Sequence, residues 1–287
     1  MQKKGLKVVN KNDIDTANVT EKKVRFSLKR GQLCIPYGLF LALFVVFPLL
    51  LIVYYAFTNG GTGGISVSDF GKFFTNRTAI TNLLYSIFIA LITTVICLVV
   101  AYPVAYILAR TSLNRNGVML LLLIMPMWIN FVLRAMAMKE LLDLIGLYGK
   151  NELVCTIIGM VYDFLPFMIL PLYSTLTKID KSMGEASQDL GGNAFITFTR
   201  VTFPLSMPGV VSGITMVFMP TMTCYVISDT FGRGKVTIIG KLIEEQFGSA
   251  RNWGYGSAIA LILLVIMLVS MALTGGFKSE NTRGTAL

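Results

Sequence analysis

Long apolar runs separated by shorter polar segments dominate the chain. Six runs are long enough to cross a bilayer, since a membrane-spanning helix needs about 20 apolar residues. The pattern predicts an all-α integral membrane protein with six transmembrane helices. We expect one membrane domain, residues 34–277, between a basic tail of residues 1–33 and a tail of residues 278–287. The six runs lie at 34–57, 83–109, 118–138, 153–176, 208–229 and 257–277.

Proline and helical spacing refine these elements. Because neighbouring helices can satisfy the carbonyls that a proline frees, we expect prolines inside the spans to cause kinks rather than breaks. Residues 237–247 carry apolar positions at helical spacing and predict a short extra helix at the membrane surface. The prolines inside the predicted spans include Pro48, Pro103, Pro126, Pro166, Pro171 and Pro220.

Basic residues indicate which side of the membrane each loop faces. Nine of the 25 Lys and Arg residues lie in positions 1–33, as expected of a cytoplasmic segment next to anionic lipid. With that tail inside, the cytoplasmic side also holds the loops 110–115 and 177–207 and the C-terminal tail. It then carries 16 Lys and Arg residues against 9 outside. We therefore predict a multi-pass protein of the cell membrane with both termini in the cytoplasm.

Composition supports a membrane protein and removes several function classes. Only 14% of the residues are charged, compared with about a quarter in a soluble domain. The net charge of +10 has no pattern typical of nucleic-acid binding. The chain lacks histidine, which excludes a Ser-His-Asp triad, and we expect no metal site. No small-residue cleavage site accompanies the first apolar run, so we expect no cleaved signal peptide. The four scattered cysteines are Cys34, Cys97, Cys155 and Cys224.

The polar loop 177–207 has the pattern of two short helices joined by a tight turn. Ser182 and Glu185 fit a capping box at the start of the first helix. Gly191 supplies a left-handed residue at its end. Asn193 can cap the second helix, which we expect Pro204 to end. Glu185 could act only as a cap, or it could also lie on a protruding hairpin that binds another subunit.

The same loop resembles a known motif. Residues Glu185 to Gly191, followed by Val201-Thr202-Phe203-Pro204, resemble the E-A-A-x-x-x-G…I-x-L-P loop of permease subunits of ABC importers. Ser187 stands where that family usually has a second Ala. The resemblance implies a type I-like importer permease fold and a cytoplasmic loop that docks on an ATPase. Its candidate coupling residues are Glu185, Ala186, Ser187, Asp189, Gly191 and Pro204.

The resemblance also implies partners. The chain contains no G-x-x-x-x-G-K-[ST] loop, so we expect it to hold no cofactor and to be no enzyme. ATP and Mg²⁺ belong to a partner dimer of ATP-binding-cassette subunits. A second, homologous permease and an extracytoplasmic substrate-binding protein are also implied, alongside membrane lipid and without nucleic acid.

Further segments resemble the first permease of spermidine/putrescine importers. They are Pro126-x-Trp128-x-Asn130-x-x-x-Arg134, Leu165 to Ser174, and Tyr225 to Asp229. The resemblance implies a polyamine as substrate. Other solutes, such as iron(III), thiosulfate or a phosphonate, remain open, as does an ion-coupled secondary transporter. An intramembrane enzyme is disfavoured by the missing histidine and the lack of paired intramembrane acids.

A path for a polycation needs carboxylates and aromatic faces. Trp128, Asp163, Tyr225 and Asp229 are therefore candidates for the substrate path. Asp163 could instead form a structural ion pair with Arg134. Asp229, at the predicted outer end of span five, could instead be a solvated helix end.

Overall fold

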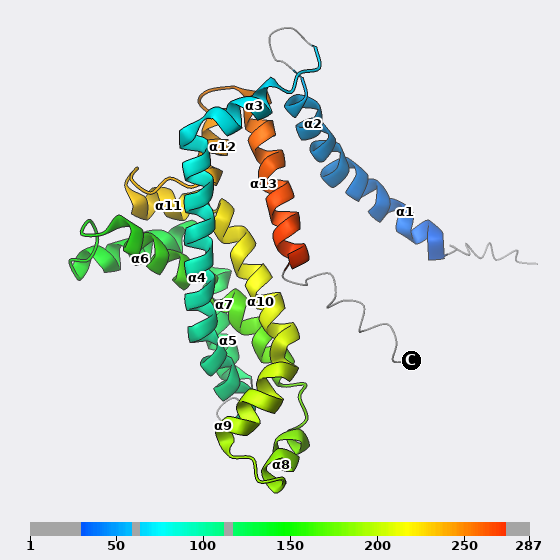
Figure 1. Ribbon diagram of the computed structural model, residues 1–287, viewed down its shortest axis with the longest axis vertical. Coiled ribbons are helices and arrows are strands. Elements are labelled where there is room, and N and C mark those ends of the chain that lie inside the picture. Colours follow the sequence, from blue (N-terminus) through cyan, green and yellow to red (C-terminus); the bar gives the residue numbers. More distant parts are fainter. Residues whose placement is uncertain (1–29, 59–63, 112–116, 274–287) are drawn as a thin grey trace, which may run out of the picture. The chain divides into compact units, whose positions relative to one another are not determined.

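The computed structural model describes residues 30–58, 64–111 and 117–273, and the side chains of 35–58, 64–111 and 117–272. Most of the two predicted tails and of the loop 110–115 lies outside these residues. Contacts divide the chain into one unit that ends at Pro48 and a second that begins at Leu49. Figure 1 shows the elements, which are α1 (Arg30–Leu41), the π turn η2 (Ala42–Val46), α2 (Phe47–Ala56), α3 (Ser68–Thr75), α4 (Arg77–Arg110), α5 (Val118–Ile124), the 3₁₀ turn η4 (Met125–Trp128), α6 (Phe131–Leu144), α7 (Glu152–Leu176), α8 (Lys181–Asp189), α9 (Ala194–Thr197), the π turn η5 (Phe198–Thr202), α10 (Phe203–Thr223), α11 (Tyr225–Gly232), α12 (Ile239–Phe247) and α13 (Trp253–Leu273).

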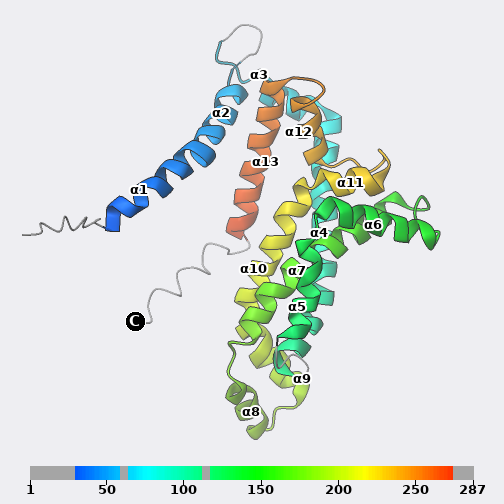
Figure 2. The same ribbon diagram turned by 180° about the vertical axis from the view of Figure 1, so that it is seen from behind.

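Three long helices, α4, α7 and α10, form the centre of the second unit and lie side by side in both views (Figures 1 and 2). Gly209 and Gly213 lie on the side of α10 that contacts α7. A Cβ at Gly209 would lie 2.7 Å from Thr175 Oγ1, and one at Gly213 would lie 2.5 Å from Met168 Sδ. Small residues therefore allow close approach of the two helices, as is common where helices pack inside membranes.

Short helices lie at the two ends of this central bundle (Figure 1). α8 and α9 lie at one end, and α3 and α12 lie at the other, next to the start of α13. The backbone amide of Ile239, at the start of α12, donates a buried 2.7 Å hydrogen bond to Ser86 Oγ of α4. The helix predicted at 237–247 is confirmed as α12. The hydrogen bond to Ser86 attaches its start to the bundle.

The predicted spans agree with the helices except in two places. Among the described residues, five helices are long and apolar enough to cross a membrane, and six if one bent pair is counted as a span. The helical segments that correspond to the predicted spans one, two, four and six are Ile35–Ala56, Arg77–Arg110, Glu152–Leu176 and Trp253–Ala272.

Span three is not the continuous helix that we predicted at 118–138. The segments Val118–Trp128 and Phe131–Leu144 meet at an angle of 97°. Pro126 lies in the 3₁₀ turn η4, and the side chain of Asn130 accepts a 2.9 Å hydrogen bond from Val132 N and so caps a new helix. The expectation of a mere kink at Pro126 is therefore wrong, because a cap residue follows it closely.

Span five is also shifted from the predicted 208–229. The helix runs continuously from Ala194 to Thr223, and Cys224 leaves the helical conformation with a ψ of 77°. The residues after it form the separate helix α11. Asp229 therefore does not lie at the end of this span, as we had predicted, but on a short helix beyond it.

Candidate functional site

Helix α8 begins at a different cap from the one predicted. Asp180 Oδ1 accepts a 3.0 Å hydrogen bond from the amide of Ser182. This bond lowers the pKa of the Asp180 carboxyl, because it stabilises the charged form. The capping box of Ser182 and Glu185 is therefore wrong. Glu185 lies one turn further on, and it is exposed.

The turn between α8 and α9 is as predicted. Gly191 has a φ of +84°, and its amide donates to Gln188 O at 2.8 Å. Asn193 Oδ1 accepts a 2.8 Å bond from Ile196 N and caps α9. The Ser187 and Thr197 hydroxyls lie 3.0 Å apart and join the two helices. The loop is thus an ordered helical hairpin.

Pro204 does not end the second helix. It occupies the first turn of α10, directly after η5, so that α9, η5 and α10 form one continuous helix. Proline has no amide to donate to the carbonyl four residues earlier, and the π turn before it accommodates this loss. The prediction overlooked that a π turn can carry a helix past a proline.

Aromatic side chains fix the base of this hairpin on α4. The ring centroid of Tyr102 lies 5.6 Å from that of Phe198 and 5.9 Å from that of Phe203. Tyr102 also shares a 2.8 Å hydrogen bond with Ser206 Oγ. A displacement of the hairpin would therefore be transmitted to α4 and α10.

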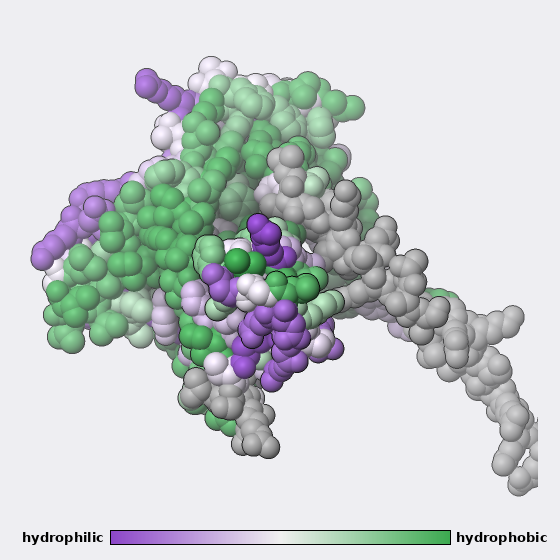
Figure 3. Space-filling model, turned by 60° about the horizontal axis from the view of Figure 1, so that its bottom comes forward, coloured by the Kyte–Doolittle hydropathy of each residue, from purple (hydrophilic) through white to green (hydrophobic). Residues whose placement is uncertain are grey.

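The tip of the hairpin exposes both polar and apolar side chains. Glu185, Ala186 and Asp189 are exposed. Leu190 is 90% exposed and Phe195 is 73% exposed. In Figure 3, which turns this end forward, hydrophilic side chains gather at the end, and much of the surface behind it is hydrophobic. Large apolar side chains at a polar end are typical of a surface that another protein covers.

A cavity of about 560 Å³ lies at the break in span three. It brings together Trp128 and Asp163, two of the four predicted path residues. Tyr225 and Asp229 do not line it. The lining residues are Met127, Trp128, Ile129, Asn130, Phe131, Arg134, Asp163, Phe164, Phe167, Pro220, Thr223, Cys224 and Ile227.

Asp163 in this cavity has a partner of opposite charge. Arg134 Nη2 lies 2.7 Å from Asp163 Oδ1, and the two side chains are 7% and 3% exposed. Arg134 Nη1 also donates a 3.1 Å bond to the carbonyl of Pro126. The ion pair that we considered for these residues is confirmed. It joins the break in span three to α7.

The other two path candidates lie on α11, outside this cavity. Ile227 of α11 lines the cavity. Tyr225 and Asp229 lie close to Lys241 of α12 instead. Lys241 is not among the residues that we predicted for the substrate path. Its three-residue spacing to Glu244 was the only signal that could have drawn attention to it.

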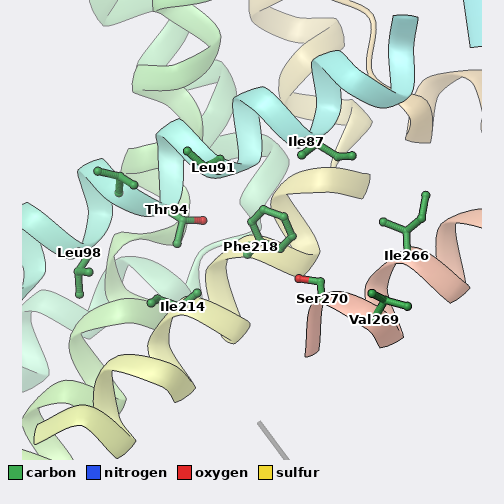
Figure 4. Close-up of a pocket in the computed structure, with 10 residues that line it drawn as sticks. Ile87, Leu91, Thr94, Leu98, Ile214, Phe218, Ile266, Val269 and Ser270 are labelled. Carbon is green, nitrogen blue, oxygen red and sulfur yellow. The ribbon is translucent and has the colours of Figure 1, made fainter. Parts of the chain in front are cut away.

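A second pocket, of about 460 Å³, lies between α4, α10 and α13 (Figure 4). Of its described lining residues, Thr94 and Ser270 are polar, and Thr94 Oγ1 already donates to Ala90 O at 2.7 Å. The remaining lining is aliphatic or aromatic. Such a pocket suits hydrocarbon and offers no anchor to a polycation.

Known proteins resemble this chain in sequence and in fold. The family model "Binding-protein-dependent transport system inner membrane component" matches residues 101–279. A spermidine/putrescine transport system permease protein PotB of Haemophilus influenzae is 35% identical over 248 residues, which are 79% of this chain and 86% of that protein. Its namesake in Escherichia coli is 38% identical over 200 residues, 64% of this chain and 73% of that protein.

A solved bacterial ABC transporter involved in the import of the acidic polysaccharide alginate has a chain with the same fold. The TM-score is 0.71 at 14% identity, covering 90% of this chain and 98% of that chain. The two chains therefore share one fold. The chain belongs to the family of inner-membrane components of binding-protein-dependent transport systems.

Proposed function

We propose that this chain is the permease subunit of an ATP-driven importer of polyamines. The observation that carries the proposal is the 35% identity, over 79% of the chain, to a permease of a spermidine/putrescine transport system. The cavity at the break in span three is consistent with such a cargo. Its rings, Trp128, Phe131, Phe164 and Phe167, offer faces for cation–π contact and surface for alkyl stretches.

The hairpin of α8 and α9 is the surface that binds the ATPase in this proposal. Leu190 and Phe195 supply exposed apolar contacts, and Glu185 and Asp189 supply charge. The turn at Gly191 keeps the tip ordered, and the Tyr102 cluster connects it to the bundle. In this proposal the α8 end faces the cytoplasm, as the excess of Lys and Arg on that side predicts.

The remaining partners follow from the same proposal. A second, homologous permease completes the path, and a binding protein delivers the polyamine at the α12 end. ATP and Mg²⁺ are bound by the ATPase dimer. The solved alginate transporter in complex with a pentasaccharide-bound periplasmic protein has a chain of the same fold, with a TM-score of 0.69. This supports a binding protein as a partner in general.

The test is uptake of labelled putrescine and spermidine by vesicles that contain the complete transport system, with its binding protein and ATP. We expect saturable uptake that unlabelled polyamine inhibits and that iron(III), thiosulfate and phosphonates do not. Uptake of one of those solutes, with no uptake of polyamine, would reject a polyamine as the substrate. The assignment of the chain to its family would be unaffected.

A further inference from the structure

The ammonium group of Lys241 lies among groups that bind cations. Its Nζ is 3.1 Å from Glu244 Oε2 and 3.8 Å from Asp229 Oδ2. It also lies 5.7 Å from the centre of the Tyr225 ring. Two carboxylates and an aromatic face thus surround one primary ammonium, contributed by the two neighbouring helices α11 and α12.

The backbone that carries Lys241 is held in place. The amide of Ile239 donates to Ser86 Oγ within the protein. Gly240 packs so closely on α10 that a Cβ there would clash with the carbonyl oxygen of Thr223. Lys241 follows directly. The position of the Lys241 ammonium is therefore set by the fixed start of α12 rather than by an unrestrained surface segment.

The carboxylates around Lys241 remain accessible. The side chains of Asp229 and Glu244 are 58% and 40% exposed, whereas that of Lys241 is 25% exposed. The hydrogen bond to Glu244 and the nearby charge of Asp229 raise the pKa of Lys241, so it stays charged at neutral pH. An incoming cation can therefore reach the two acids and compete with Lys241.

The cluster also adjoins the cavity at the break in span three. Ile227 and Cys224 line that cavity, and Tyr225 and Asp229 approach Lys241. In a helix, residues at positions 225 and 229 share one face, and position 227 lies on the other. Helix α11 therefore lies between the cluster and the cavity. The cluster is a second place for a cation, next to that cavity.

A lysine side chain ends in the same chemical group as a polyamine. Both present a primary ammonium on an alkyl chain, and both are attracted by carboxylates and by the face of a tyrosine. We propose that Lys241 is a tethered competitor, whose ammonium occupies the place where one ammonium of a polyamine binds Asp229, Glu244 and Tyr225. This inference rests on the proposed function, since it needs a polyamine as substrate.

The experiment measures equilibrium binding of labelled putrescine to the purified permease–ATPase complex without its binding protein. Lys241→Met keeps the apolar stem and removes the competing charge. We expect its dissociation constant for putrescine to fall by about threefold to tenfold, the range that corresponds to one weak cation contact. Lys241→Arg keeps a cation in place and should bind putrescine no better than the wild type.

The matched control is Lys235→Met, which removes the same charge from a lysine that pairs with Glu152 at 2.5 Å and is 71% exposed. It should leave putrescine binding unchanged. Adding Asp229→Asn to Lys241→Met should cancel the gain, because the vacated carboxylate is lost. A thermal unfolding curve for each complex checks folding, and Lys241→Gln replaces Lys241→Met if the latter is unstable.

Two results would overturn the inference. One is binding by Lys241→Met that is equal to or weaker than wild-type binding. The other is an equal gain in Lys235→Met, which would reveal a general effect of net charge. If the complete wild-type system imports polyamines and either result is found, only the tethered competitor is rejected. If that system imports no polyamine, the proposed function fails and the inference fails with it.

Discussion

At the scale of single residues, the ion pair of Arg134 and Asp163 decides what the cavity can do. Both side chains are buried, and Arg134 also binds the carbonyl of Pro126. A carboxylate that is already neutralised is a poor receptor for a second cation. The pair therefore acts first as a support for the break in span three, and in the proposed function it is the aromatic rings that contact the substrate.

This role of the ion pair predicts a characteristic double-mutant result. Asp163→Asn alone and Arg134→Gln alone each leave one buried charge without its partner, at a cost of about 3–5 kcal/mol. The double variant should recover much of that loss. The measurement is the unfolding temperature of the detergent-solubilised protein. A stable Asp163→Asn variant with reduced uptake would instead assign Asp163 to the substrate path.

Asp229 is the path candidate with the most accessible carboxylate, and it too can be tested alone. Asp229→Asn should lower the maximal rate of polyamine uptake, because one of the two acids that meet the cation is lost. Asp229→Glu keeps the charge and should have a smaller effect. Substrate binding by the isolated binding protein should not change.

The control for Asp229 is Asp143→Asn, which makes the same change at an exposed position of α6. Uptake in reconstituted vesicles and ATP hydrolysis are measured together for all variants. Equal uptake by the wild type and by Asp229→Asn, at saturating binding protein, would reduce Asp229 to a solvated helix end.

The sequence predicted the pairing of Asp163 with Arg134 but not the contacts of Lys241. Asp163 and Arg134 could be paired because intramembrane charges require partners. Lys241 could not be foreseen beside Tyr225 and Asp229. That contact depends on the close packing of Gly240 against Thr223, and such packing leaves no pattern in the chain.

At the scale of elements, the hydrophobic pattern located the membrane helices but not all of their ends. A run of apolar residues looks the same whether its helix is straight or bent. Span three breaks because Asn130 caps a new helix only four residues after Pro126. Span five continues back through Pro204, because the π turn η5 directly before it accommodates the missing amide. Local hydrogen bonding decided both cases.

The turn between α8 and α9 was predicted correctly, because it depends on local backbone conformation. Gly191→Val should disturb it. The residue has a φ of +84° and nothing lies within 4 Å of the position of a Cβ, so the cost of about 1–3 kcal/mol arises from the backbone alone. We expect a protein that inserts in the membrane and co-purifies poorly with its ATPase.

Gly71→Val is the matched control for Gly191→Val. Gly71 lies in α3 with equally open space at the position of a Cβ, and it has no left-handed φ. That variant should assemble with the ATPase as the wild type does. Normal assembly and normal uptake in Gly191→Val would remove the hairpin from the coupling mechanism.

At the scale of the whole molecule, the two functional regions lie at different ends of the bundle of α4, α7 and α10 (Figure 2). Tyr102 of α4 contacts Phe198 of η5, the turn that directly follows the hairpin, and it shares a hydrogen bond with Ser206 of α10. The cation cluster contacts the bundle through Ser86 of α4 and Thr223 of α10. The same two helices therefore connect both regions, and a shift between them offers a route from ATP hydrolysis to the substrate path.

This connection predicts that ATP, and no ion gradient, drives uptake. Vesicles that contain the complete system should accumulate polyamine when ATP is supplied, even after an ionophore has collapsed the proton and sodium gradients. They should stop when ATP is withdrawn and the gradients are kept. Glu185→Ala, which alters the exposed face of α8, should lower uptake more than it lowers ATP hydrolysis, because the hairpin transmits the motion. Uptake that persists without ATP and follows an imposed gradient would support an ion-coupled transporter instead, and the α8 hairpin would then need another role.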